Sequence, residues 1–117
     1  MINLSTFRVV SNETIAPDVR HIRLMPENGE VFNFIPGQFI TIHFQKNDKL
    51  FRRSYSIASI PGKDTSIDFA ASYVPGGVAS EYLFSLEIGD ALQVSGPFGR
   101  LILREDSFKQ LFLIATG

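Results

Sequence analysis

The chain has 117 residues, of which 44% are hydrophobic and 20% charged, a composition typical of one globular domain rather than of a disordered segment. Its formal net charge of −1 argues against a basic surface for nucleic acid or for an anionic membrane. Because it contains no cysteine, it forms no disulfide, thiolate zinc site or cysteine-ligated iron–sulfur cluster. The N-terminus lacks a signal-peptide pattern and no apolar stretch reaches membrane-spanning length, so we expect a cytoplasmic domain.

Turn signals rich in Pro, Gly, Asn and Asp recur about every ten residues along the chain. They lie at residues 17–18, 26–29, 36–37, 46–48, 61–64, 75–77 and 96–99. The short runs between them are enriched in β-branched and aromatic residues. This spacing predicts an all-β barrel or sandwich.

Two of these runs, residues 20–24 and 39–44, alternate between apolar and polar side chains as half-buried strands do. The positions that we expect to be buried are Ile22, Leu24, Ile40, Ile42 and Phe44. A third run, residues 67–73, begins in the same way, but Ala70, Ala71 and Ser72 make its centre small on both faces. Small side chains on both faces indicate that something bulky packs against this strand.

The segment from Val78 to Leu86 instead places its apolar residues at a helical spacing, which predicts one short helix. Gly76 and Gly77 precede it. Unbonded main-chain N–H groups at a helix start attract anions, and Ser80 adds a hydroxyl in the first turn. The alternative is an ordinary hairpin-to-helix turn with a serine near its start, which is common.

Residues 111–117 form a continuous apolar run that ends in a small-residue turn. Such a run is typical of a strand buried on both faces of a parallel sheet, a strand that a helix usually follows. We therefore expect this end of the chain to begin a second domain.

The run Arg53-Ser54-Tyr55-Ser56 combines a fixed positive charge, an aromatic ring and two hydroxyls. In a strand, Arg53 and Tyr55 project to one face, and Ser54 and Ser56 to the other. An Arg beside an aromatic side chain suits a ligand with an anionic part and a planar part. Taken alone, the pattern favours a plainer interpretation, an exposed Arg packed on a neighbouring Tyr.

Five motifs of this chain resemble those of the flavin-binding barrel of the ferredoxin–NADP(H) reductase superfamily. They follow one another along the chain in the same order as in that family and span nearly the whole chain. The first, R-x-Y-[ST]-x-x-S, is matched by Arg53, Tyr55, Ser56 and Ser59, and the second, G-x-x-S-x-x-L, by Gly77, Ser80 and Leu83. The others are P-G-Q-F at residues 36–39, G-P-x-G at 96–99, and the strand and Gly turn at 113–117.

The resemblance implies an all-β fold, a six-stranded antiparallel Greek-key barrel with one short helix. It implies that residues 1–108 form the flavin-binding domain. Residues 109–117 would be the first strand and turn of a truncated NAD(P)-binding domain. FAD is the favoured cofactor, because a helix start suits a diphosphate, and FMN is the alternative, since FMN-binding relatives share both motifs.

The resemblance also assigns roles to residues. Arg53 would contact the flavin phosphate, Tyr55 would lie against the ring or ribityl chain, and Ser56 would reach the N5 edge as the residue closest to the chemistry. The full predicted cofactor-binding set is Arg53, Ser54, Tyr55, Ser56, Ala70, Ala71, Ser72, Gly77, Val78, Ala79, Ser80 and Thr116. No metal site is expected, since His21 and His43 are predicted to lie on separate strands at outward positions, with no Cys or carboxylate cluster nearby.

The implied function is that of an FAD-dependent NAD(P)H oxidoreductase that passes electrons to a ferredoxin, flavodoxin, oxygenase or free flavin. NAD(P)H would be held by the missing domain, so that this chain would be weakly active alone. The alternative is a non-catalytic carrier barrel that binds flavin or lumazine. An oligonucleotide-binding barrel is disfavoured by the near-neutral charge and by the lack of a basic, aromatic strip.

Overall fold

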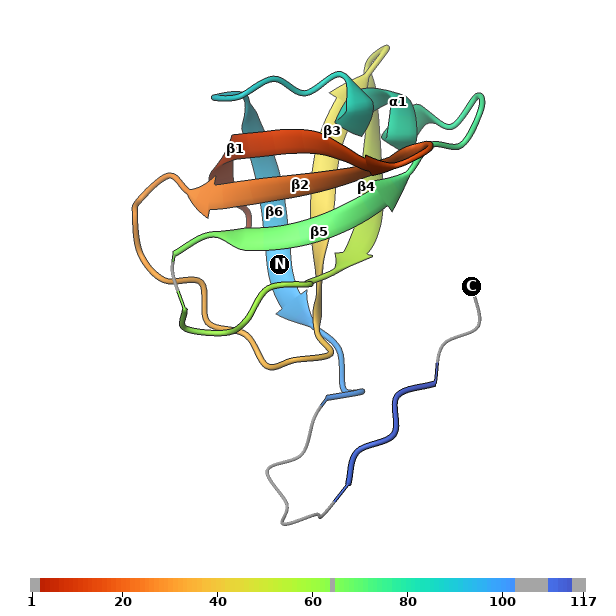
Figure 1. Ribbon diagram of the computed structural model, residues 1–117. Coiled ribbons are helices and arrows are strands. Elements are labelled where there is room, and N and C mark those ends of the chain that lie inside the picture. The colour runs from red at the N-terminus through yellow and green to blue at the C-terminus, as the bar shows by residue number, and fades with distance from the viewer. Residues whose placement is uncertain (1–2, 64, 103–109, 115–117) are drawn as a thin grey trace.

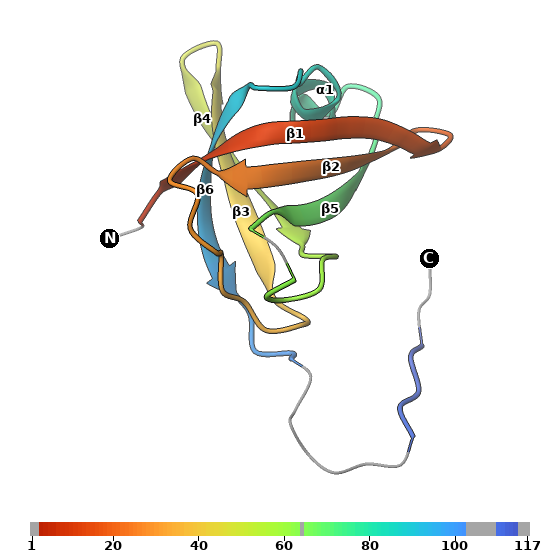
Figure 2. The same cartoon turned by 60° about the vertical axis from the view of Figure 1, so that its left-hand side comes forward.

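The computed structural model describes residues 3–63, 65–102 and 110–114. Its elements in chain order are β1 (Ser5–Ala16), β2 (Val19–Pro26), β3 (Phe39–Lys46), β4 (Lys49–Ser56), β5 (Ile67–Ser72), α1 (Val78–Phe84) and β6 (Ala91–Phe98). The strands form one sheet in the order β4-β3-β6-β1-β2-β5, and all pairings between neighbours are antiparallel. Figures 1 and 2 show this sheet curled into two layers that cross steeply, β6-β3-β4 against β1-β2-β5. The predicted six-stranded antiparallel fold with one short helix is confirmed.

Side-chain alternation explains the core. Every position predicted to be buried is buried, namely Ile22, Leu24, Ile40, Ile42 and Phe44. Two-residue turns set the register of the hairpins. Between β3 and β4, Asn47 and Asp48 both have positive φ angles, of 51° and 62°, which are the conformations that a type I′ turn requires.

Helix α1 covers one end of the curled sheet. The ring of Tyr82 stacks on Phe44 of β3 with 4.3 Å between ring centroids, and Leu83 is only 1% exposed. The side-chain amide of Asn12 on β1 donates to the carbonyls of Leu83 and Leu86, each at 3.0 Å. Helix α1 is thus held to strands from both layers. Because the helix is held in place, so is the end of the glycine-rich turn that leads into it.

The sheet does not close, because no ladder joins its two end strands, β4 and β5, in the described chain. We call the line along which these two strands face each other the β4–β5 seam. At one end of the seam the Ala58 N–H donates to the Asp68 carbonyl at 2.8 Å, and the Asp68 N–H donates to Ser59 Oγ. Alternate residues of a strand direct their main-chain groups to the same side. The N–H and C=O groups of Ala70 and Ser72 therefore face the seam as well.

The predicted domain boundary falls in a part of the chain that the structure covers only partly. Residues 103–109 and 115–117, including Thr116, lie outside the described residues. Residues 110–114 adopt neither helix nor strand, and Leu111–Ile114 are exposed by 55% to 90%. The second domain therefore stays a prediction. Within the described ranges, no helix has the length and apolarity that crossing a membrane requires.

Candidate functional site

Arg53 and Tyr55 lie side by side on the inward face of β4. They pair with Ile42 and Ile40 of β3, whose side chains are buried, and directly paired residues share a face of the sheet. The ring of Tyr55 packs against Phe69 of β5, with 5.0 Å between ring centroids. Tyr55 is half-buried, whereas Arg53 is exposed at the open seam. The predicted alternation along β4 is confirmed.

The charge on Arg53 is not neutralised by the protein. Its Nη1 donates to the Arg52 carbonyl at 2.7 Å, and no carboxylate in the described ranges forms an ion pair with it. Burial raises the pKa of the Tyr55 phenol, and the Arg53 charge opposes this by a smaller amount. The phenol therefore stays protonated at neutral pH. The two side chains offer an exposed cation and a neutral aromatic group.

Ser54 and Ser56 project to the outer face of β4, and their hydroxyls differ in use. Ser54 Oγ lies 3.0 Å from Thr41 Oγ1, within hydrogen-bonding distance. Ser56 is exposed at the end of the strand, and within the described chain its hydroxyl has no hydrogen-bonding partner. Of the two, only Ser56 has an uncommitted hydroxyl.

On the opposite side of the seam, β5 presents main-chain groups and small side chains. Ala71 is 2% exposed and belongs to the core, whereas Ala70 and Ser72 have exposed side chains. The Tyr73 N–H turns away from the seam and donates to the Asp18 carbonyl at 2.7 Å, which agrees with Ser72 facing it. A ligand in the seam would therefore meet the β5 backbone without large side chains in between.

The glycine-rich turn before α1 is held from inside by Ser80, whose side chain is almost fully buried at 4% exposure. Its Oγ accepts from the Val74 N–H at 2.9 Å and lies 3.0 Å from the Val74 carbonyl. The hydroxyl expected to reach a phosphate is thus already bonded within the turn. Ser80 keeps only its main-chain N–H for a ligand.

The first turn of α1 leaves main-chain donors uncommitted. Gly77 is the N-cap and brings no side-chain cap, and the first intrahelical bond runs from the Glu81 N–H to the Gly77 carbonyl at 3.1 Å. The N–H groups of Val78, Ala79 and Ser80 therefore have no acceptor within the helix. They lie beyond the β5 end of the seam, since Ser72 leads into this turn (Figure 1).

Each of the two histidines lies beside a polar side chain of a neighbouring strand. Pairing of β2 with β5 brings Asp68 beside His21, and His21 Nε2 lies 2.9 Å from Asp68 Oδ2. This contact depends on a pairing between distant segments, which local sequence does not show. His43 Nε2 lies 2.7 Å from Ser95 Oγ. In the described part of the chain no three potential ligands gather in a way that could hold a metal ion.

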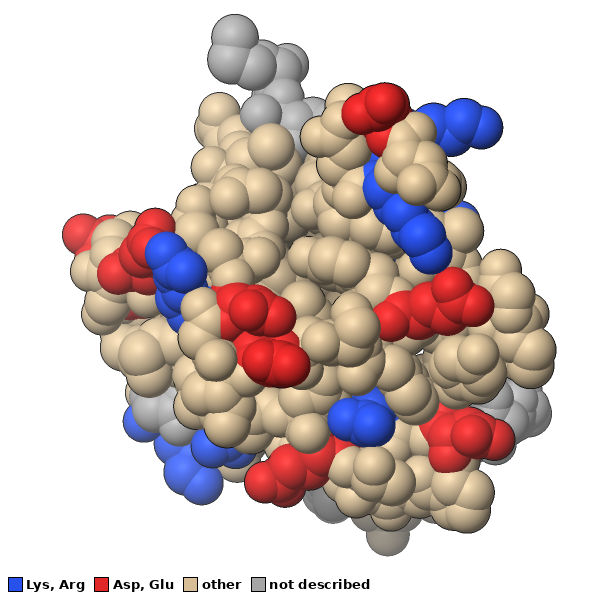
Figure 3. Space-filling model, turned by 90° about the horizontal axis from the view of Figure 1, so that it is seen from above, with Lys and Arg blue, Asp and Glu red and all other residues tan. Residues whose placement is uncertain are grey.

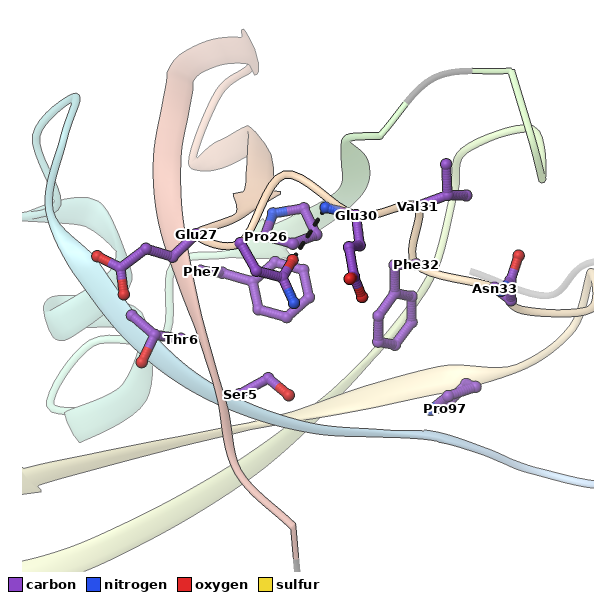
Figure 4. Close-up of a pocket in the computed structure, with 11 residues that line it drawn as sticks. Ser5, Thr6, Phe7, Pro26, Glu27, Glu30, Val31, Phe32, Asn33 and Pro97 are labelled. Atoms are coloured by element: carbon purple, nitrogen blue, oxygen red, sulfur yellow. Dashed lines mark hydrogen bonds between the residues drawn. The ribbon is translucent and has the colours of Figure 1, made fainter.

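A large cavity lies elsewhere. It has a volume of about 640 Å³ and is lined by the start of β1, the end of β2 and residues 27–33 (Figure 4). Its lining residues include Glu27 and Glu30 but no Lys or Arg, and Arg8 already pairs with Glu27. A phosphate would be repelled there. On the face seen in Figure 3, acidic and basic side chains of the described residues are interspersed.

A family model described as the oxidoreductase FAD-binding domain matches residues 6–102 of the chain. The chain belongs to this family. It is 36% identical, over 96% of its length, to reductase component 1 of terephthalate 1,2-dioxygenase from Comamonas sp, and 34% identical, over 94%, to ferredoxin–NADP reductase B from Sorangium cellulosum. It spans 32% and 45% of these two proteins. A solved ferredoxin reductase of carbazole 1,9a-dioxygenase matches 91% of the chain at 29% identity with a TM-score of 0.78, and the chain covers 32% of it.

The residues of this FAD-binding domain fit the cofactor. FAD carries two phosphates and a planar ring system, which call for cationic or N–H donors at one end and flat, neutral surfaces at the other. The exposed Arg53 and the uncapped start of α1 meet the first need. The neutral Tyr55 and the bare β5 edge meet the second.

Proposed function

We propose that FAD binds along the β4–β5 seam and that the chain serves as the flavin domain of an NAD(P)H oxidoreductase. The observation that carries the proposal is the exposed Arg53, without a carboxylate partner in the described chain, beside the half-buried Tyr55 at an open seam. A cation without a counter-ion beside a neutral ring is the arrangement expected of a site for a phosphorylated aromatic ligand.

The α1 end of the seam would hold the diphosphate. Arg53 supplies a fixed positive charge, and the N–H groups of Val78, Ala79 and Ser80 supply directed donors. Gly77 is required there for steric reasons, since a Cβ at this position would lie 2.9 Å from the Val74 carbonyl oxygen and 3.1 Å from Ser80 Oγ. Ser80 acts by holding the turn in shape.

The other end would hold the ring system. When bound, FAD supplies a ring that accepts a hydride at N5 and releases electrons singly. Tyr55 excludes water from one side of the ring, and the β5 backbone at Ala70 and Ser72 provides donors and acceptors for its polar edge. Ser56, whose hydroxyl has no partner in the described chain, hydrogen-bonds near N5 and orients the acceptor without acting as a nucleophile.

The source and destination of the electrons lie outside the seam. We propose NAD(P)H as donor and a ferredoxin, flavodoxin, oxygenase or free flavin as acceptor, because the similar proteins are reductase components of dioxygenases and a ferredoxin–NADP reductase. Those relatives are about two to three times as long as this chain, which leaves room for a nicotinamide-binding domain. Residues 109–117 would begin that domain, with Thr116 near the flavin. The proposed setting is the cytoplasm.

Binding and reduction of flavin test this proposal. The chain should bind FAD, and binding should shift the visible absorbance spectrum of the flavin. Riboflavin should bind at least roughly tenfold more weakly, because it lacks the phosphates. Under anaerobic conditions, dithionite should bleach the bound FAD at once, whereas NAD(P)H should bleach it slowly. Chain that stays colourless after FAD is added and excess flavin is removed would contradict the proposal.

The carrier alternative makes a different prediction. A barrel that carries flavin or lumazine without turnover needs no phosphate contact, so riboflavin and FAD would bind equally well. It would also leave Arg53 without a role. Equal affinities, unchanged by Arg53→Ala, would favour the carrier over the oxidoreductase.

A further inference from the structure

Asp68 joins three parts of the barrel at the end of the seam that is far from α1. It belongs to β5, and its carboxylate contacts β2 through His21 at 2.9 Å and through Arg23, whose Nε and Nη2 each donate at 3.0 Å. Its N–H and C=O face the seam and bond Ser59 Oγ and the Ala58 N–H, just beyond β4. We call these contacts the Asp68 clip.

The clip is more enclosed than the other ion pairs. The Asp68 side chain is 14% exposed, whereas Glu27 and Glu81, the other described carboxylates in ion pairs, are 49% and 43% exposed. Partial burial strengthens charge-assisted hydrogen bonds, since less water screens them. Arg23 adds a bidentate geometry, which fixes the direction as well as the distance of the carboxylate.

The clip sets what a ligand in the seam would meet. Ala70 lies two positions after Asp68 on β5, and Ser72 lies two positions after Ala70. The main-chain groups of all three residues therefore face the same side. On the β4 side, the bonds at Ala58 and Ser59 fix the chain directly after Ser56. The clip therefore holds both edges of the seam at a defined separation where they would meet the flavin ring.

We propose that Asp68 and Ser59 are positioning residues for the flavin ring, which act through the Asp68 clip and do not touch the cofactor. This inference rests on the proposed FAD site and adds residues to it. Ser59 belongs to the R-x-Y-[ST]-x-x-S motif, and the clip gives that serine a physical role: it supplies the acceptor for the Asp68 N–H. Asp68, His21 and Arg23 lie outside every motif.

Affinity for FAD, set against stability, tests the inference. Ser59→Ala and Asp68→Asn should weaken FAD binding roughly three- to tenfold, as expected for the loss of a hydrogen bond that orders the site. Ser59→Thr keeps the hydroxyl and should restore binding. Two matched controls far from the seam are Thr6→Val, which removes a hydroxyl bonded to Gln93, and Glu27→Gln, which breaks the pair with Arg8. Both should bind FAD as the unaltered chain does, even where they melt at a lower temperature.

Amide hydrogen exchange gives a second readout that does not depend on FAD binding. In the chain without flavin, the Asp68 amide should exchange slowly and the Ala70 and Ser72 amides fast; in Ser59→Ala, Asp68 should exchange fast as well. If the unaltered chain fails to bind FAD, the proposed function falls. If it binds, but Ser59→Ala and Asp68→Asn bind equally tightly or lose affinity only in step with the controls' loss of stability, the clip has no positioning role and the FAD site stands.

Discussion

The two ends of the β4–β5 seam use their polar groups in opposite ways. At the Asp68 end, carboxylate, hydroxyl and main-chain groups all bond one another. At the α1 end, Arg53 donates to the carbonyl of its neighbour and has no ion-pair partner among the described residues, and the first amides of the helix have no intrahelical acceptor. An exposed cation and uncommitted main-chain N–H groups can exchange water for a phosphate. We therefore call the Asp68 end satisfied and the α1 end unsatisfied, and we propose that the first gives the site its shape and the second its affinity.

The largest expected effect comes from removing the charge at the unsatisfied end. Arg53→Ala should lower FAD affinity roughly 10- to 100-fold, since charge-assisted hydrogen bonds contribute about 1.5–3 kcal/mol. Arg52→Ala is the matched control, because Arg52 is the adjacent exposed arginine on the other face of β4. Isothermal titration with FAD measures both. Equal losses in the two variants would mean that general charge, and not the seam, attracts the cofactor.

Next come the two glycines of the turn, which should respond differently to substitution. Gly77→Ala forces a Cβ against the Val74 carbonyl, and overpacking of this kind costs about 1–3 kcal/mol of unfolding free energy. Gly76 has open space but a φ of +75°, so Gly76→Asn should be nearly neutral, because Asn tolerates this conformation. Urea denaturation measures the difference. A Gly77→Ala variant as stable as the unaltered chain would show that the turn relaxes easily.

Ser80 should behave as part of the frame and not as a ligand. Ser80→Ala removes the acceptor of the Val74 N–H, and it should cost about 1–2 kcal/mol of unfolding free energy. Ser85→Ala, at the exposed end of α1, is the control and should change stability by no more than about 0.5 kcal/mol. Thermal melts without FAD suffice. If Ser80→Ala leaves stability unchanged but abolishes FAD binding, its hydroxyl contacts the cofactor after all.

The smallest effect concerns pH at the satisfied end. Burial alone would raise the pKa of the Asp68 carboxyl, but hydrogen bonds and charges from Arg23 and His21 outweigh it and lower that pKa. A lowered pKa in the folded chain adds stability that is complete above about pH 4, the unfolded value, and is lost as pH falls through the folded value. Among the described residues, Arg23 and His21 contact this carboxylate, and Lys63 lines the same pocket.

Asp68→Asn should therefore lose less stability between pH 5 and pH 3 (about the range in which carboxyls titrate) than the unaltered chain does. Denaturant unfolding at a series of pH values measures this. Parallel curves for the two proteins would show that Asp68 does not contribute to the acid dependence.

The sequence predicts the strands well and the seam poorly, for a physical reason. Alternation of buried residues and turn chemistry are local signals, so Ile40, Ile42 and the turn at Asn47 could be recognised without a structure. Which strands become the free edges depends on the order of strands in the sheet, which local patterns do not encode. The open seam and the main-chain groups at Ala70 and Ser72 therefore emerge only from the fold.

The residues that the motifs identify divide in the same way. Strand alternation correctly predicts that Arg53 and Tyr55 share one face. The motifs identify which residues of the strand to consider. They do not show that the Ser80 and Ser54 hydroxyls are already bonded, to Val74 and Thr41, because those partners are several residues or a strand away. Asp68 has no motif at all; only the pairing of β2 with β5 brings it to His21.

Amide hydrogen exchange with and without FAD tests most directly whether the seam is the cofactor site. Added FAD should slow exchange at Ala70 and Ser72 and at the first amides of α1, Val78 and Ala79. Exchange should not change around the large cavity lined by Ser5, Glu30 and Phe32. Protection at that cavity, with the amides of β5 and α1 unaffected, would contradict FAD binding in the seam.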